Sequence, residues 1–217
     1  MSAVFPRRYD VIVVGGGHAG VEAALASARM GRATLLLTQS LDTVAAMSCN
    51  PSIGGTGKGQ MVRELDALGG EMAKAADRAG LFYQTLNMGK GQAVRSPRVQ
   101  CDKAAYRRGQ KAVIEAAPGL DPVQDEAWAL WIEGSKLRGV LSRRGTRYEG
   151  ATVVLTTGTF LNGLAHVGLN SHAAGRGGEP PALGLSSSLS ALGLPLGRLK
   201  TGTPPRLHGR TIDYGRL

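Results

Sequence analysis

Residues 9–20 read YDVIVVGGGHAG, a short apolar run rich in Val and Ile that leads straight into three glycines. A run without polar interruption is typical of a parallel strand buried on both faces, here Tyr9 to Val14. The Ala-rich stretch from Ala19 to Met30, closed by Gly31, predicts a helix. Ala33 to Thr38 predicts a second buried strand. The sequence therefore begins as a strand–turn–helix–strand unit of an α/β fold.

The glycines of this turn fit the pattern G-x-G-x-x-G, and they stand where the strand gives way to the helix. In a dinucleotide-binding fold, Gly15 permits the tight turn, Gly17 lets a pyrophosphate approach the backbone, and Gly20 lets the helix pack on the sheet. The N–H groups and the dipole at the helix N-terminus favour the same anion. The alternative is a glycine-rich turn without a ligand. The residues expected to bind the cofactor are Gly15, Gly16, Gly17, His18, Ala19 and Gly20.

The usual acidic partner of the ribose hydroxyls is missing from the end of the second strand. Dinucleotide-binding folds place an Asp or Glu about 20 residues after the glycines. Here the strand ends in Thr38-Gln39-Ser40, and the first acid is Asp42. The hydroxyl of Thr38 or Ser40 is the expected substitute.

A predicted β-meander favours FAD over NAD as the cofactor. Its three short antiparallel strands are expected at 127–132, 137–143 and 146–148, and a buried strand, Ala151 to Leu155, follows them. Flavoproteins of the glutathione-reductase-like, two-dinucleotide-binding type have this order, and their returning strand ends near the cofactor. We therefore expect a Rossmann-like FAD-binding domain, with Thr157 and Gly158 beside the cofactor.

The stretch AMSCNPSIGGTGKG at 46–59 resembles a P-loop but lacks its essential residues. A P-loop needs G-x-x-x-x-G-K-[ST], whereas the first glycine position holds Ser52 and the position after the lysine holds Gly59. The glycines at 54, 55, 57 and 59 instead predict a loop with positive φ that lies against a flat ligand.

Cys49 on this loop is the candidate catalytic residue. It lies outside any regular apolar pattern, and Lys58 together with a helix N-terminus after the loop would favour its thiolate form. The alternative is a small buried residue without reactivity, which is the usual state of a free cysteine. Cys101, next to a predicted helix start, is expected in the core.

Two more helices are predicted, at 58–79 with an interruption at Gly69-Gly70 and at 103–117, and a short one at 186–192. The segments 172–181 and 202–205 are rich in Gly and Pro and predict loops. Basic residues gather in three groups. The groups are Lys90, Arg95 and Arg98, then Lys103, Arg107 and Lys111, and finally Arg198, Lys200, Arg206 and Arg210.

Composition limits the class of protein. The 217 residues carry a formal net charge of +10, which favours a polyanionic partner such as nucleic acid. Two cysteines argue against a disulfide scaffold. The N-terminus lacks a signal-peptide pattern, no run approaches the roughly 18 apolar residues of a membrane span, and the histidines lack metal-ligand spacing. We expect a soluble, cytoplasmic protein without a metal site.

Five stretches together resemble the MnmG family, formerly called GidA, over essentially the whole chain. They are GGGHAGVEAALASARMG, the segment LLLTQSLDTVAAMSCNPSIGGTGKGQMVRELDALGGEMAKAAD, KGQAVRSPRVQCDKAAYR, VVLTTGTFLNG and GRLKTGTPPR. The resemblance implies a flavoprotein that works with the GTPase MnmE on tRNA. Together they add an aminomethyl or carboxymethylaminomethyl group to C5 of the wobble uridine, using FAD, NADH and methylenetetrahydrofolate. It also implies a homodimer at full length, FAD contacts at Ala127 and Ala182, and activity that depends on Cys49.

Members of this family are several hundred residues longer than this chain. We therefore expect an N-terminal part, with residues 1–205 in an incomplete FAD-binding domain and 206–217 at the start of a second domain, inactive when alone. Two other readings stay open. The first is a non-catalytic remnant that binds nucleotide or RNA. The second is a methyltransferase like TrmFO, which uses folate and FAD on a tRNA uridine.

Overall fold

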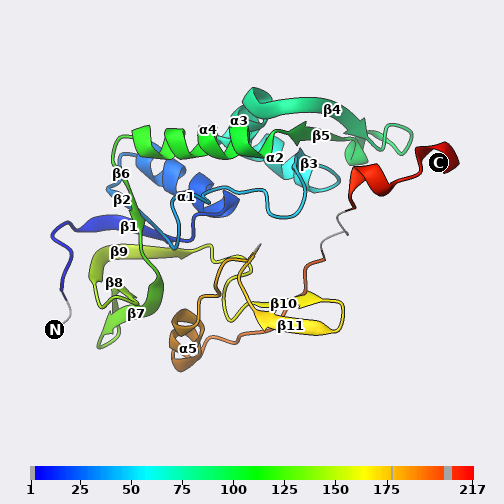
Figure 1. Cartoon of the computed structure of the whole chain (residues 1–217). Helices are drawn as coiled ribbons and strands as arrows, with labels where there is room; N and C mark the ends of the chain where they lie inside the picture. Colours follow the sequence, from blue (N-terminus) through cyan, green and yellow to red (C-terminus); the bar gives the residue numbers. More distant parts are fainter. Residues whose placement is uncertain (1–2, 177, 203–206) are drawn as a thin grey trace.

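The computed structural model describes residues 3–176, 178–202 and 207–217 (Figure 1). Its main sheet has six strands in the order β6-β2-β1-β9-β8-β7. The four strands β6, β2, β1 and β9 are parallel, and β8 and β7 continue the sheet antiparallel. Their bounds are β1 Tyr9–Val14, β2 Thr34–Thr38, β6 Leu120–Gln124, β7 Ala127–Glu133, β8 Lys136–Ser142 and β9 Arg147–Leu155. The predicted α/β class is confirmed.

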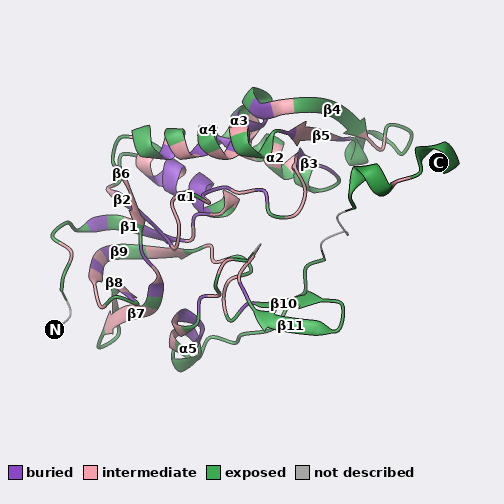
Figure 2. Ribbon diagram, in the orientation of Figure 1, coloured by how far each residue is buried: buried purple, intermediate pink, exposed green. Residues whose placement is uncertain are grey.

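The β1–α1–β2 unit forms as predicted, with α1 at His18–Arg29. Side chains alternate between the faces of a strand, so Val13 and Leu36 pack against α1 and against α4, Lys103–Ala116. Ile12 and Leu35 point to the opposite face, into a second cluster with α5, Gly184–Ala191, and the meander. Both faces of β1 and β2 are covered, which explains their unbroken apolar sequence; Figure 2 shows these strands largely buried.

The meander and the parallel sheet share one strand, which corrects a prediction. The sequence suggested a third meander strand at 146–148 and a separate buried strand from Ala151. In the structure β9 runs unbroken through both: Tyr148 pairs with β8, and Gly150 to Leu155 pair with β1. The nine residues of β9 are polar in the first half of the strand and apolar in the second, so the sequence suggested two strands where one long strand pairs with both β8 and β1.

A second, three-stranded sheet lies beside the helices and was not predicted. It consists of β3 Ser52–Gly54, β5 Ser96–Cys101 and β4 Gly80–Leu86, in the order β3-β5-β4 and antiparallel. The predicted helix at 58–79 is two helices, α2 Lys58–Ala67 and α3 Met72–Ala79, broken at the expected glycines. The sheet was missed because β4 is largely exposed and β5 contains Pro97, so that neither strand shows apolar alternation.

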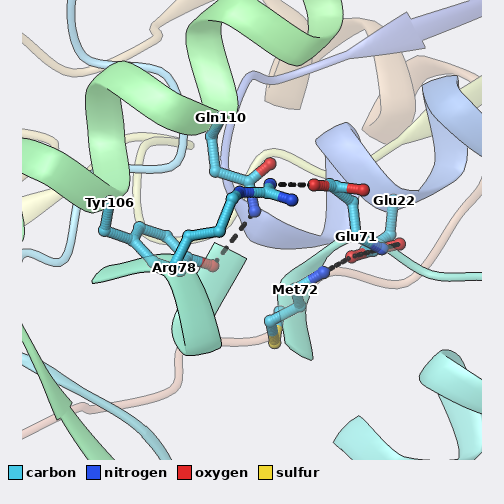
Figure 3. Close-up of polar contacts among 6 residues, drawn as sticks. All are labelled: Glu22, Glu71, Met72, Arg78, Tyr106 and Gln110. Carbon is cyan, nitrogen blue, oxygen red and sulfur yellow. Dashed lines mark hydrogen bonds and ion pairs between the residues drawn. The ribbon is translucent and has the colours of Figure 1, made fainter. Parts of the chain in front are cut away.

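A buried carboxylate fixes α3 against α1 (Figure 3). Glu22 on α1 is 7% exposed, and its oxygens accept hydrogen bonds from the backbone N–H groups of Glu71 at 2.9 Å and Met72 at 2.5 Å. Glu71, the N-cap of α3, in turn pairs with Arg78 in the last turn of the same helix. Glu22 therefore caps α3 from another helix, and the pair of helices after the 46–59 loop is held against the first βαβ unit.

The remaining elements are exposed. They are the hairpin β10 Leu164–Val167 and β11 Asn170–Ala173, and the 3₁₀ turns η1 Gln92–Val94, η2 Gly209–Thr211 and η3 Tyr214–Arg216. The short helix predicted at 186–192 is α5, shifted by two residues at its start. Arg206 and the predicted boundary after residue 205 lie outside the described residues, so that division stays a prediction.

In the described part of the chain, every helix is too short or too polar to cross a membrane. Over the same residues, no group of three or more His, Cys, Asp or Glu side chains is arranged to hold a metal ion.

Candidate functional site

A cavity of about 530 Å³ opens at the carboxyl ends of the parallel strands β1, β2 and β9. This edge of an open α/β sheet is where such folds bind ligands. Six parts of the chain line it, and they are far apart in sequence. These parts are the turn 14–18, the end of β2 at 37–40, the 43–58 loop, residues 125–127, residues 156–160 and four residues near α5, Arg176, Glu179, Ala182 and Leu185, with Arg98 added from β5.

The glycine turn packs tightly under α1. Gly15 has φ +108°, a backbone conformation that favours glycine. A Cβ atom on Gly20 would lie 1.8 Å from the carbonyl oxygen of Gly15, so that α1 can approach the turn only with glycine at this position. The hydroxyl of Thr156, at the end of β9, donates to the carbonyl oxygens of Val14 at 2.9 Å and Gly15 at 3.0 Å. The turn is therefore fixed by both the helix and the neighbouring strand.

Gly17 faces open space. A Cβ atom there would meet no protein atom within 4 Å, and the residue is the N-cap of α1 without a side-chain cap. The first turn of an α-helix carries backbone N–H groups that have no partner within the helix. A bare backbone, a helix N-terminus and an open cavity thus meet at one point, which suits a phosphate-bearing ligand.

Most of the residues predicted to form the site line this one cavity. They are Gly15, Gly16, Gly17, His18, Cys49, Ala127, Thr157, Gly158 and Ala182. Ala19 instead lines a second cavity of about 620 Å³ between α1 and α2, and Gly20 has the packing role described above. The expected ligand contacts of all these residues stay predictions.

The end of β2 contains a residue that the sequence reading passed over. The amide nitrogen and oxygen of Gln39 are buried and have no hydrogen-bond partner among the described residues, and Gln39 lines the cavity with Thr38 and Ser40. Asp42 points away, because its carboxylate is 85% exposed and pairs with Lys111 at 2.7 Å. Gln39 was identifiable from its place, one residue after β2, where the acid is usual.

The loop that carries Cys49 is attached to the glycine turn. The N–H of Ala45 donates to the carbonyl oxygen of Gly16 at 2.8 Å, and Val44, Ala45 and Met47 are buried. Cys49 follows them, half-buried on the cavity wall, with Sγ 3.9 Å from the carbonyl oxygen of Gly202. Lys58 begins α2, where the sequence predicted a helix start, and it lines the same cavity.

The predicted positive φ is found at Gly54, Gly55 and Gly57, and Gly54 and Gly55 line the cavity. Gly54 and Gly59 are also required for packing. A Cβ atom on Gly54 would lie 2.2 Å from the carbonyl oxygen of Pro97, and one on Gly59 would lie 2.1 Å from the Ser96 hydroxyl. Both glycines let β3 and the start of α2 approach β5.

The potential near the glycine turn is positive. Burial, together with the charges of Arg176 and Lys58, lowers the pKa of His18 to about 4. The imidazole is therefore neutral at physiological pH. An anion at this position would be stabilised by the same charges that disfavour the imidazolium ion.

Cys101 and the basic groups divide between core and surface. Cys101 is 3% exposed, so that its expected place in the core is confirmed. Arg98 alone of the first two basic groups lines the cavity, whereas Lys111 pairs with Asp42 and Glu115 on the surface. Arg198 donates to the carbonyl oxygen of Asn162.

Comparisons with known proteins agree on one family. The profile of the family described as glucose inhibited division protein A, GidA, matches residues 10–217. The tRNA uridine 5-carboxymethylaminomethyl modification enzyme MnmG of Syntrophotalea carbinolica is 59% identical over 99% of this chain, which spans 35% of that relative's length.

Solved structures give the same result. GidA of Aquifex aeolicus matches with a TM-score of 0.91 and 49% identity over 97% of this chain and 35% of that one. A GidA-related protein from Thermus thermophilus matches with a TM-score of 0.64 and 27% identity, over 86% of this chain and 69% of that one. The chain thus spans about a third of the length of its MnmG and GidA relatives.

Proposed function

The chain belongs to the GidA family, and we propose that it forms the FAD-binding part of an enzyme that modifies a uridine of tRNA. The observation that carries the proposal is the meeting of Gly17, the N-terminus of α1 and Cys49 on one cavity. The name of the 59% identical relative from Syntrophotalea carbinolica supports tRNA uridine as the substrate.

FAD fits the residues that line the cavity. The backbone at Gly17 and the N-terminus of α1 would hold the diphosphate, because no side chain intervenes there. Gln39, whose buried amide lacks a described partner, would take a ribose hydroxyl in place of the usual carboxylate. Thr157, Gly158 and Ala182 would contact the rest of the cofactor. When bound, FAD supplies the oxidation–reduction chemistry that protein side chains lack.

Cys49 would act on the substrate side of this cavity. Two roles stay open for its thiol: addition to C6 of the uridine, and handling of the one-carbon unit. In the first role a bond forms between Sγ and C6, and the electron pair moves toward C5, which then attacks the one-carbon unit. Loss of the C5 proton and departure of the thiolate restore the base. The half-buried position of Cys49 leaves its Sγ within reach of such a substrate.

For the whole enzyme we propose the reaction of the MnmG family. An aminomethyl or carboxymethylaminomethyl group would be added to C5 of the wobble uridine, with methylenetetrahydrofolate, NADH and the GTPase MnmE, by a homodimer in the cytoplasm. The net charge of +10 on this chain is favourable for tRNA. The NADH site, the MnmE contact and the dimer would involve the longer protein, since this chain spans a third of its relatives.

A titration tests the cofactor proposal directly. We expect the purified chain to bind FAD, with quenching of flavin fluorescence and an absorbance spectrum typical of a flavoprotein. A matched variant, Gly17→Ala, should keep the fold and lose most of this affinity. Failure of the folded chain to take up FAD at any concentration tested would refute the proposal. Nucleoside analysis of tRNA modified by the longer protein would separate the MnmG reaction from uridine methylation.

A further inference from the structure

Arg176 holds three segments of the cavity wall together. Its Nε–H donates to Oε2 of Glu179 at 2.6 Å, and one Nη2–H donates to the carbonyl oxygen of Thr43 at 2.6 Å. The guanidinium carbon lies 5.5 Å from the centre of the Phe160 ring, within the range of a cation–π interaction. Glu179 also accepts a hydrogen bond from the Thr43 hydroxyl at 2.6 Å. The side chain is thus fixed by the loop after β2, by Phe160 in the segment after β9 and by its own loop.

This guanidinium lies on the same cavity as the glycine turn. Arg176 and His18 both line it, and the charge of Arg176 is among the causes of the lowered pKa of His18. Lys58 and the N-terminus of α1 add positive potential at the same place. The side chain of Arg176 is only 17% exposed, so its attraction to a neighbouring anion is stronger than it would be in bulk water.

The carboxylates on the cavity are already engaged. Glu179 is the counter-ion of Arg176. Asp125 accepts from the Tyr148 hydroxyl, and Glu126 pairs with Arg143 through Oε2, although its buried Oε1 has no partner among the described residues. Asp125 lies beside the end of β2, where its N–H donates to Thr38. At the glycine turn, positive charge therefore prevails.

We propose that Arg176 is a cofactor-binding residue that supplies a side-chain cation to the diphosphate of the dinucleotide. The proposal rests on the function proposed above, that the cavity binds FAD. A guanidinium has five N–H donors, and the two described hydrogen bonds to protein use two of them. The others are available to phosphate oxygens, to which arginine donates charge-assisted hydrogen bonds. Glu179, Thr43 and Phe160 would keep the charge in position before the ligand arrives.

The rival explanation is a purely structural ion pair between Arg176 and Glu179. The two explanations predict different effects of Glu179→Gln on the affinity for FAD. If Arg176 binds the diphosphate, removal of its counter-ion by Glu179→Gln leaves more positive charge for the ligand, so the affinity is kept or increased. If the pair only holds the loop, Glu179→Gln and Arg176→Met weaken binding alike.

The experiment measures the affinities of the purified chain for FAD, for ADP and for riboflavin, which has no phosphate, at several salt concentrations. We expect Arg176→Met to weaken FAD and ADP about 10-fold to 100-fold, because one charge-assisted hydrogen bond is lost. Riboflavin binding should be unchanged, and the salt dependence of FAD binding should become weaker. Arg176→Lys should recover part of the loss, since it keeps the charge and loses the planar fork.

Controls separate the proposal from the function on which it rests. Arg138→Met removes a similar ion pair, with Glu133 on the meander hairpin, and should change no affinity. If wild-type chain does not bind FAD, the proposed function fails, and with it this inference. If wild type binds and Arg176→Met binds equally well, only the inference is overturned. Equal losses for Arg176→Met and Glu179→Gln, or a matching loss of riboflavin affinity, would also overturn it. Should Arg176→Met not fold, Arg176→Lys and Glu179→Gln give the same decision.

Discussion

Two alanine substitutions in the glycine turn should separate folding from cofactor binding. Gly17→Ala and Gly20→Ala add one methyl group each, one at the N-cap of α1 and one in its first turn, and the two methyl groups meet different surroundings. At position 17 the methyl group meets no protein atom within 4 Å, and φ is −74°, which alanine adopts without strain. At position 20 it lies 1.8 Å from the carbonyl oxygen of Gly15.

The geometry sets the size of each effect. For Gly17→Ala we expect a free energy of unfolding within about 1 kcal/mol of wild type, since the lower entropy of the unfolded chain offsets the weaker N-cap preference of alanine. The methyl group enters the space proposed for the diphosphate, so FAD affinity should fall at least about 10-fold, which is about 1.4 kcal/mol. For Gly20→Ala, α1 must move away from the turn. An overpacked contact costs about 1–3 kcal/mol of stability, and at this distance the upper end is expected.

Urea unfolding of the apo chain, followed by circular dichroism, gives the stabilities, and flavin fluorescence gives the affinities. The expected pattern is a stable variant at position 17 that binds poorly, and a destabilised variant at position 20 that also binds poorly. A Gly17→Ala chain with wild-type affinity for FAD would refute the place of the diphosphate. A Gly20→Ala chain as stable as wild type would refute the close contact of α1 with the turn.

Glu22→Ala leaves the N–H groups of Glu71 and Met72 without their buried acceptor, so the free energy of unfolding in urea should fall by about 2–4 kcal/mol. A fall below about 0.5 kcal/mol would contradict the capping role. Half-buried Cys49 should react with iodoacetamide while buried Cys101 stays protected, and bound FAD should slow the reaction of Cys49. The labelled peptides are measured by mass spectrometry, and equal labelling with and without FAD would place Cys49 away from the cofactor. The pKa of His18 falls from 6.5 in the unfolded chain to about 4 in the native chain, so between these pH values only the unfolded chain binds the proton. The free energy of unfolding should therefore rise by roughly 2–3 kcal/mol from pH 4 to pH 6.5. His18→Gln should flatten this rise, and an unchanged pH profile in that variant would exclude His18 as its cause.

Local sequence predicted the first βαβ unit well, because each of its elements is specified by neighbouring residues. The apolar runs of β1 and β2 are continuous since both faces are covered, and glycines mark the turn and the end of α1. The meander and α4 were found by the same local signals. The small sheet β3-β5-β4 was missed, because its strands are stabilised by each other and by α2 and α3 rather than by an apolar pattern of their own.

The candidate site was predicted in part for a similar reason. The glycine turn is specified by residues that are adjacent in the sequence, so a local pattern was sufficient to predict it. The place of Gln39, one residue after β2, marks it in the sequence, but the burial of its amide, which distinguishes it from Thr38 and Ser40, is seen only in the structure. Arg176 was read only as part of a loop, because its contacts with Thr43 and Phe160 join positions that are far apart in the chain.

By itself, the sequence determined the α/β start, the tight turn, the helix that follows it and the family resemblance, since all of these depend on residue types at short spacing. Only the tertiary structure decided that Cys49, Gln39 and Arg176 share one cavity with that turn. The physical reason is that a cavity is bounded by segments that the sheet order brings together, and strand order is fixed by long-range packing rather than by local propensity.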